Sequence, residues 1–203
     1  MALSFRRSSL VLILPRSCFL HVPKTGGTWV KRAIEAAGIE CHPFTDGANQ
    51  HPTLAQCPCP EKFKFAFVRH PLNLYRSYWQ FKMTYGWDPL NALDQACRRD
   101  DFAAFVDAVL TTMPGIYSRS LRDFVGPPGQ EIDFIGKYES LTDDLIRALQ
   151  LAGEGFDAAA IRALPPANAS DKQRFPAEFT PELTARVLAA EAEAVSRFGY
   201  QGS

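Results

Sequence analysis

The stretch Cys18-Phe-Leu-His-Val-Pro-Lys-Thr-Gly-Gly-Thr-Trp29 predicts a short buried strand, a tight turn and the beginning of a helix. Pro23 ends the strand, because proline has no amide hydrogen to give to the ladder of a sheet. The strand rests on the apolar residues Phe19, Leu20 and Val22. The helix is indicated by apolar residues that recur at helical spacing, namely Val30, Ala33, Ile34 and Ala37. This strand-turn-helix junction is the main indication of both the fold class and the function of the chain.

The turn has the composition of an anion site. Gly26 and Gly27 let the backbone approach a ligand closely, and the amides that open the helix are expected to point at one place. Lys24 adds a full positive charge, and Thr25 and Thr28 add hydroxyl groups. One of these two threonines is also expected to cap the helix. The pattern therefore predicts binding of a phosphate or a sulfate group.

Residues 23–29 do not form a Walker A motif, because the lysine comes before the glycines. They resemble the 5′-phosphosulfate loop of the sulfotransferases that use 3′-phosphoadenosine 5′-phosphosulfate (PAPS). The resemblance implies that Lys24 contacts the oxygen between phosphate and sulfate, that the loop from Thr25 to Thr28 holds the 5′-phosphate, and that Trp29 stacks on adenine. Two alternatives stay open: an ordinary strand-turn-helix with a spare lysine, and a Trp29 that only packs in the core.

A second strand-to-helix junction lies at residues 64–79. The buried strand Lys64–Val68 leads directly into Arg69-His70-Pro71, and Ser77 follows within the helix. This segment resembles the 3′-phosphate motif of the same family, in which the matching arginine and serine hold the 3′-phosphate of PAPS. The alternative is a surface cation and a helix-surface hydroxyl. Ligands of parallel sheets bind beyond the carboxyl ends of the strands, so both junctions are expected to face one crevice.

The remaining segments extend the same pattern. Residues 89–125 are expected to be helical and residues 132–138 to form a strand, with Ser140 and Thr180 capping later helices. In the Golgi-type branch of the family, an Asn-containing segment before the last helix lies near the nucleotide. The residues here that match it are Asn168, Ser170 and Lys172.

One domain over residues 1–203 is expected. It should be an α/β three-layer sandwich with a mainly parallel central sheet and a nucleotide-kinase-like (P-loop-like) topology. The apolar run Ser9–Leu14 is read as an extra strand or a packed arm, because it is too short to span a membrane. Lysine plus arginine equals aspartate plus glutamate, 22 each, which argues against nucleic acid as a partner. The five cysteines are read as free thiols in a reducing compartment, so a cytoplasmic location is expected.

Sulfuryl transfer also needs a base for the acceptor's proton, and His51 is the first candidate because a neutral imidazole suits that role near pH 7. His21 and Asp46 are the next candidates. No metal is expected, since Lys24 and the amides supply the positive charge. The acceptor is expected to be a hydroxyl or amine on a small molecule, a carbohydrate or a peptide; its identity and the oligomeric state cannot be read. Two rivals stay open, a nucleotide-dependent kinase and a non-catalytic module that binds PAPS or its product PAP.

Overall fold

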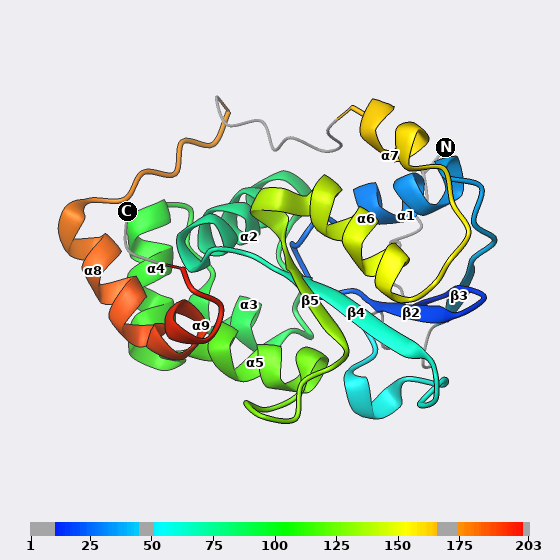
Figure 1. Cartoon of the computed structure of the whole chain (residues 1–203). Helices are drawn as coiled ribbons and strands as arrows, with labels where there is room; N and C mark the ends of the chain where they lie inside the picture. The colour runs from blue at the N-terminus through cyan, green and yellow to red at the C-terminus, as the bar shows by residue number, and fades with distance from the viewer. Residues whose placement is uncertain (1–10, 45–50, 166–173, 201–203) are drawn as a thin grey trace. The chain divides into compact units, whose positions relative to one another are not determined.

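The computed structural model describes residues 11–44, 51–165 and 174–200 (Figure 1). Contacts within the chain divide it into two compact units: Met1–Val68 with Arg122–Ala167, and Arg69–Leu121 with Asn168–Ser203. Each unit is described by itself. The single domain expected over residues 1–203 stays a prediction.

The first unit is built on a sheet with the strand order β3-β1-β2-β4-β5. β2, β4 and β5 are parallel to one another, whereas β1 is antiparallel to both β2 and β3. The predicted strands of the two junctions and of residues 132–138 are confirmed, with slightly different ends. The strand bounds are Val11–Ile13 (β1), Ser17–Leu20 (β2), His42–Phe44 (β3), Phe63–Val68 (β4) and Phe134–Lys137 (β5).

The prediction of a three-layer sandwich around a mainly parallel, nucleotide-kinase-like sheet is wrong, because the sheet is mixed. The reason lies in residues 14–16, which join β1 to β2. A connection this short allows only an antiparallel pair, since a parallel pair needs a crossover of a dozen or more residues. The amide of Leu14 donates to the Ser17 carbonyl across 2.9 Å and closes this turn. Of the two readings left open for the N-terminal run, the extra strand is confirmed.

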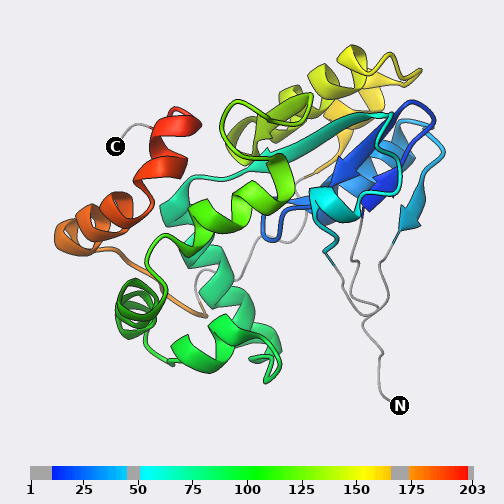
Figure 2. The same ribbon diagram turned by 90° about the horizontal axis from the view of Figure 1, so that it is seen from below.

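Three helices of the first unit pack on one face of the sheet: α1 (Gly27–Ala36), α6 (Leu141–Leu151) and α7 (Ala158–Ala163). Figures 1 and 2 show the yellow-green α6 beside the blue and cyan strands. Phe19, Phe65 and Phe67 meet the helices in one apolar cluster. The strand residues between them point to the opposite face and are also buried, among them Cys18, Leu20, Ala66 and Val68. Two short 3₁₀ turns, η1 (Leu54–Gln56) and η2 (Tyr138–Ser140), complete this unit.

The second unit is helical. Its helices are α2 (Pro71–Tyr85), α3 (Ala92–Cys97), α4 (Phe102–Thr112), most of α5 (Ile116–Val125), α8 (Pro181–Ala190) and α9 (Ala192–Arg197). Its interior is aromatic, with the Trp79 and Phe102 rings 5.4 Å apart. Thr180 caps α8 as expected, since its hydroxyl accepts from the Leu183 amide at 3.1 Å. Within the described ranges of either unit, no helix is both long and apolar enough to cross a membrane.

Candidate functional site

The first junction is a strand, a strained turn and a helix, as expected. β2 ends at Leu20, and α1 begins at Gly27 with Gly26 as its N-cap in a left-handed conformation, φ 89°. Lys24 also has a positive φ, 67°, which non-glycine residues rarely adopt. Neither threonine caps the helix, so that expectation is wrong: left-handed Gly26 holds the cap position without a side-chain bond. The amides of Gly27 and Thr28 open α1 at its positive end, and the backbone bonds at its start run from Trp29 and Val30 to the Gly26 carbonyl, at 2.9 and 3.0 Å.

The two threonines of the turn have different roles. Thr25 is buried, and its hydroxyl donates to the Val22 carbonyl across 2.8 Å, which closes the turn from inside. Thr28 is exposed in the first turn of α1. Of the two hydroxyls expected to bind an anion, therefore, Thr28 is the accessible one, and Thr25 gives its proton to the backbone.

The glycines are required by packing within the first unit. A Cβ on Gly27 would lie 2.1 Å from Nε2 of His21, and a Cβ on Gly26 would lie 2.7 Å from a methyl carbon of Leu141. The His21 imidazole thus lies directly against the start of α1. The two glycines therefore have a packing role in addition to the expected close approach to a ligand. The sequence alone did not reveal this packing role.

His21 and His51 form a pair beside this turn. Their rings are 4.9 Å apart, and Nδ1 of His51 lies 3.3 Å from the His21 carbonyl oxygen. Because a carbonyl only accepts, this contact assigns the proton to Nδ1 of a neutral His51 and makes Nε2 its proton-accepting nitrogen. The predicted base is therefore held in the tautomer that base chemistry requires.

Burial keeps both imidazoles neutral. It lowers the pKa of His21 to about 3, helped by the charges of His51 and Lys24, and His21 is only 8% exposed. Burial also lowers the pKa of His51, which the bond to the His21 carbonyl raises and the Lys24 charge lowers. The ammonium group of Lys24 thus acts electrostatically on both rings. The predicted base His51 thus lies beside His21, whose ring is against the start of α1, the helix that follows the turn with Lys24.

Trp29 belongs to the core of the first unit. Its side chain is 7% exposed and lies in the apolar cluster with Val30 and Ile34. Its indole N–H donates to the Pro165 carbonyl across 3.1 Å. Of the two alternatives for Trp29, packing in the core is the one that the structure supports, and adenine stacking is dropped from the site.

The second junction is also present. β4 ends at Val68, Arg69 follows, and α2 begins at Pro71 with His70 as its N-cap. The Arg69 backbone is clamped by Tyr117, whose hydroxyl accepts from the Arg69 amide at 2.9 Å and donates to the Arg69 carbonyl at 2.8 Å. Ser77 lies on α2 and is 7% exposed.

Tyr117 is a residue that the sequence reasoning missed. It lies 48 residues from Arg69, and no local pattern links the two. Asn168, Ser170, Lys172 and the alternative base Asp46 lie outside the described residues.

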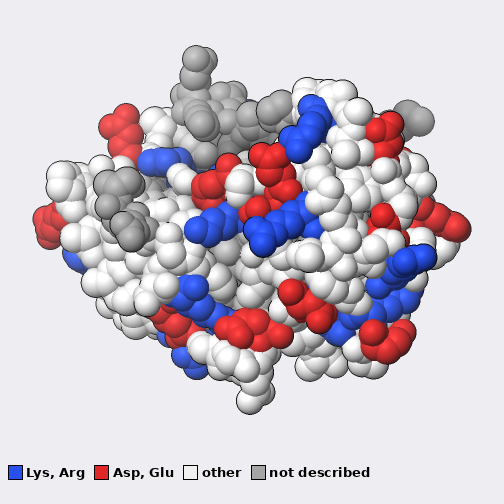
Figure 3. Space-filling model, viewed as in Figure 1, with Lys and Arg blue, Asp and Glu red and all other residues white. Residues whose placement is uncertain are grey.

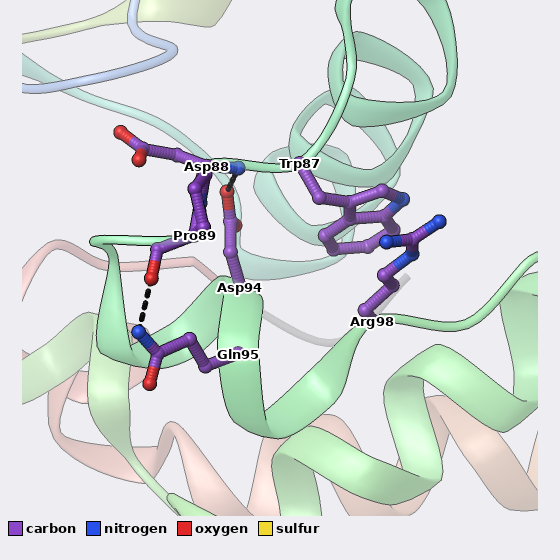
Figure 4. Close-up of a pocket in the computed structure, with 6 residues that line it drawn as sticks. All are labelled: Trp87, Asp88, Pro89, Asp94, Gln95 and Arg98. Carbon is purple, nitrogen blue, oxygen red and sulfur yellow. Dashed lines mark hydrogen bonds between the residues drawn. The ribbon is translucent and has the colours of Figure 1, made fainter.

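A pocket of about 270 Å³ lies in the second unit, lined by Trp87, Asp88, Pro89, Asp94, Gln95 and Arg98 (Figure 4). Several of its polar groups already serve the fold. Asp94 accepts from the Asp88 amide at 2.7 Å and pairs with Lys82 at 2.5 Å, and the Gln95 amide donates to the Pro89 carbonyl. None of the predicted site residues lines this pocket.

On the face viewed in Figure 3, positive and negative side chains are interspersed, in line with the equal numbers of each in the sequence. Among the residues that the structure describes, no group of three or more His, Cys, Asp and Glu side chains could hold a metal ion. Comparisons of the chain with protein-family models, curated proteins and solved structures found no match.

Proposed function

We propose that this protein is a sulfotransferase that moves the sulfuryl group of PAPS to a hydroxyl or amine of a small molecule, a carbohydrate or a peptide. One observation carries the proposal: His51, predicted as the base, contacts His21, whose ring lies against Gly27 at the same strand-turn-helix junction that carries Lys24, the predicted leaving-group cation. The resemblance of residues 23–29 to the 5′-phosphosulfate loop supplies the identity of the donor.

The residues of the first unit suit the chemistry of sulfuryl transfer. The acceptor oxygen or nitrogen attacks sulfur, the bond from sulfur to the bridging oxygen breaks, and negative charge develops on the departing phosphate. Lys24, the first amides of α1 and the Thr28 hydroxyl are suited to stabilise that charge. Nε2 of His51 takes the acceptor's proton, while the His21 carbonyl holds the tautomer through Nδ1.

The 3′-phosphate of the donor is assigned to Arg69 and Ser77 in the second unit, on the basis of their resemblance to the family motif. A guanidinium offers parallel donors that match a phosphate, and Tyr117 fixes the Arg69 backbone from both its amide and its carbonyl. Arg69→Ala should therefore weaken binding of PAP at least tenfold, as expected for a charge-assisted bond of about 1.5 to 3 kcal/mol. Binding of adenosine 5′-phosphosulfate, which lacks the 3′-phosphate, should change much less. Equal losses for both ligands would exclude this assignment.

Transfer itself is tested with radiolabelled PAPS and a panel of phenols, amines, sugars and peptides. Label should move to at least one acceptor class, and Lys24→Ala should lower kcat about 10²- to 10³-fold with a smaller effect on PAPS binding. Lys31→Ala is the matched control, because Lys31 lies on α1, which begins after the turn that holds Lys24, and it pairs with Glu35 at 3.5 Å. PAP binding without transfer to any class would favour the non-catalytic module instead.

A further inference from the structure

Three of the five cysteines, Cys18, Cys57 and Cys59, gather on the face of the sheet opposite α1 and α6. Cys18 lies on β2 and is fully buried, whereas Cys57 and Cys59 follow η1 and are half-buried. Cys18 and Cys57 are neighbours that each shift the pKa of the other, and Cys59 also acts on the pKa of Cys18. Sγ of Cys57 lies 3.9 Å from the Cys59 carbonyl oxygen.

Lys64 completes this thiol cluster. It is the register partner of Cys18 in the parallel pair of β2 and β4. Its ammonium group donates to the carbonyls of Pro60 at 2.6 Å and Lys62 at 2.9 Å, which anchors the segment that carries Cys57 and Cys59. A positive charge is therefore held next to two neighbouring thiols, of which Cys57 is half-buried.

We propose that Cys57 and Cys18 form a reversible modification site, in which a hydroperoxide oxidises Cys57 and Cys18 then closes a disulfide. The thiolate is the reactive form of cysteine, and sensor cysteines combine thiolate character, access and a neighbouring resolving thiol. This proposal does not rest on the proposed transferase activity.

The electrostatics of the thiol cluster select Cys57 as the first thiol to react. The bond from Cys18 lowers the pKa of Cys57 most, and a backbone bond from Cys59 and the Lys64 charge lower it further, against burial and the Glu61 charge, which raise it. The bond to Cys57 raises the pKa of Cys18, as do burial and the charge of Cys57. When Cys57 becomes a neutral sulfenic acid, its charge no longer opposes the deprotonation of Cys18.

The two steps balance. The Cys57 thiolate attacks the peroxide oxygen, the O–O bond breaks, and the departing hydroxide takes a proton to leave as water. Sulfur of Cys18 then attacks the Cys57 sulfenic acid, the S–S bond forms, the S–O bond breaks, and a second water leaves with the Cys18 proton. Two thiols are oxidised and one peroxide is reduced to two waters. A dithiol reductant restores both cysteines.

The test is peptide mapping of the full chain after treatment with hydrogen peroxide. Without reductant, the tryptic peptides Ser17–Lys24 and Ala33–Lys62 should appear linked, and fragmentation should place the bond on Cys57. Dithiothreitol should separate them. Cys57→Ser should abolish the link and Cys59→Ser should retain it. A bond between Cys57 and Cys59, or no link between the two peptides, would overturn the proposal.

Cys41 is the matched control, because it is also half-buried, and burial raises its pKa as the first cause. At pH 7, Cys57 should react with iodoacetamide at least about tenfold faster than Cys41 in the wild-type protein, a comparison that needs no variant to fold. Trapping with dimedone, which captures sulfenic acids, should label Cys57 when Cys18→Ser removes the resolving thiol. Equal alkylation rates for Cys57 and Cys41 would contradict the assigned order of reaction.

Discussion

His51 shows how the properties of a single side chain come from its neighbours. Nδ1 of His51 lies 3.3 Å from the His21 carbonyl oxygen. Burial disfavours the imidazolium form of His51, and the positive charge of Lys24 opposes protonation further. Burial and the Lys24 charge keep His51 neutral, which is the state that a general base needs, although the bond to the His21 carbonyl raises its pKa. The sequence supplied the candidate, but the tautomer depends on a carbonyl 30 residues away in the chain.

His51→Ala should lower kcat by about 10²- to 10⁴-fold while leaving the affinity for PAP nearly unchanged. In the wild type, activity should be lost as the pH falls through the pKa of His51. Burial lowers that pKa, so this acidic limb should lie below the reference value of about 6.5. The limb should be missing from the pH-rate profile of the variant. Steady-state kinetics measure both effects with an acceptor from the panel.

His42→Ala is the control for this variant, because His42 is exposed on β3 and its Nε2 lies 3.3 Å from the exposed Glu40 carboxylate. It should keep the kcat and the pH profile of the wild type. A His51→Ala variant with normal kcat would remove His51 from the mechanism and leave the donor site as proposed.

Residue type alone could not settle the roles of Trp29 and Thr25. An aromatic ring at the start of a helix suits both a core and an adenine, and the choice depends on Pro165, which is 136 residues distant. A threonine hydroxyl can donate to a ligand or to the backbone, and Thr25 donates to Val22. Such choices are fixed by tertiary contacts that a local pattern does not contain.

At the scale of the elements, the strands and helices around both junctions could be predicted, because apolar runs, prolines and glycines mark their ends. The sequence did not reveal that β1 runs antiparallel to its neighbours β2 and β3. An apolar run has the same local pattern in a parallel and in an antiparallel strand, and the short link of residues 14–16 decided the direction. The parallel set β2-β4-β5 nevertheless keeps both junctions at the carboxyl ends of neighbouring strands.

Glu191 connects four helices of the second unit, namely α2, α5, α8 and α9. It is fully buried between α8 and α9, and its carboxylate accepts from the amides of Tyr117 and Ser118 in the first turn of α5 at 3.2 and 2.8 Å. It also accepts from the hydroxyls of Tyr75 and Ser118 at 2.8 and 2.6 Å. A carboxylate at a helix N-terminus satisfies amides that have no other helical partner. The same contacts position Tyr117, which clamps Arg69.

Glu191→Gln should lower the free energy of unfolding by about 3 kcal/mol or more. The amide keeps the shape, but its NH₂ group faces donors and leaves some of them unsatisfied in a buried place. Urea unfolding followed by circular dichroism measures the loss. Glu182→Gln is the matched control, because Glu182 is exposed on α8, and it should stay within about 0.5 kcal/mol of the wild type. Similar stabilities for the two variants would show that the carboxylate contacts do not stabilise this unit.

At the scale of the whole molecule, the equal numbers of acidic and basic residues leave anion recognition to local groups. In our proposal these are Lys24, Thr28 and the start of α1 in the first unit, and Arg69 and Ser77 in the second unit. The acceptor could not be read from the sequence, because the shape of an acceptor pocket depends on which distant segments come together. Named residues therefore specify the sulfuryl donor in this proposal, whereas they do not specify the acceptor.

The most direct test of the proposal is therefore calorimetric titration of the full chain with PAP in the absence of magnesium and with ATP in its presence. A sulfotransferase that uses Lys24 and Arg69 as its cations should bind PAP without the metal, and more tightly than it binds ATP with magnesium. A clear preference for ATP with magnesium would contradict the assignment of PAPS as the donor and favour a nucleotide-dependent kinase.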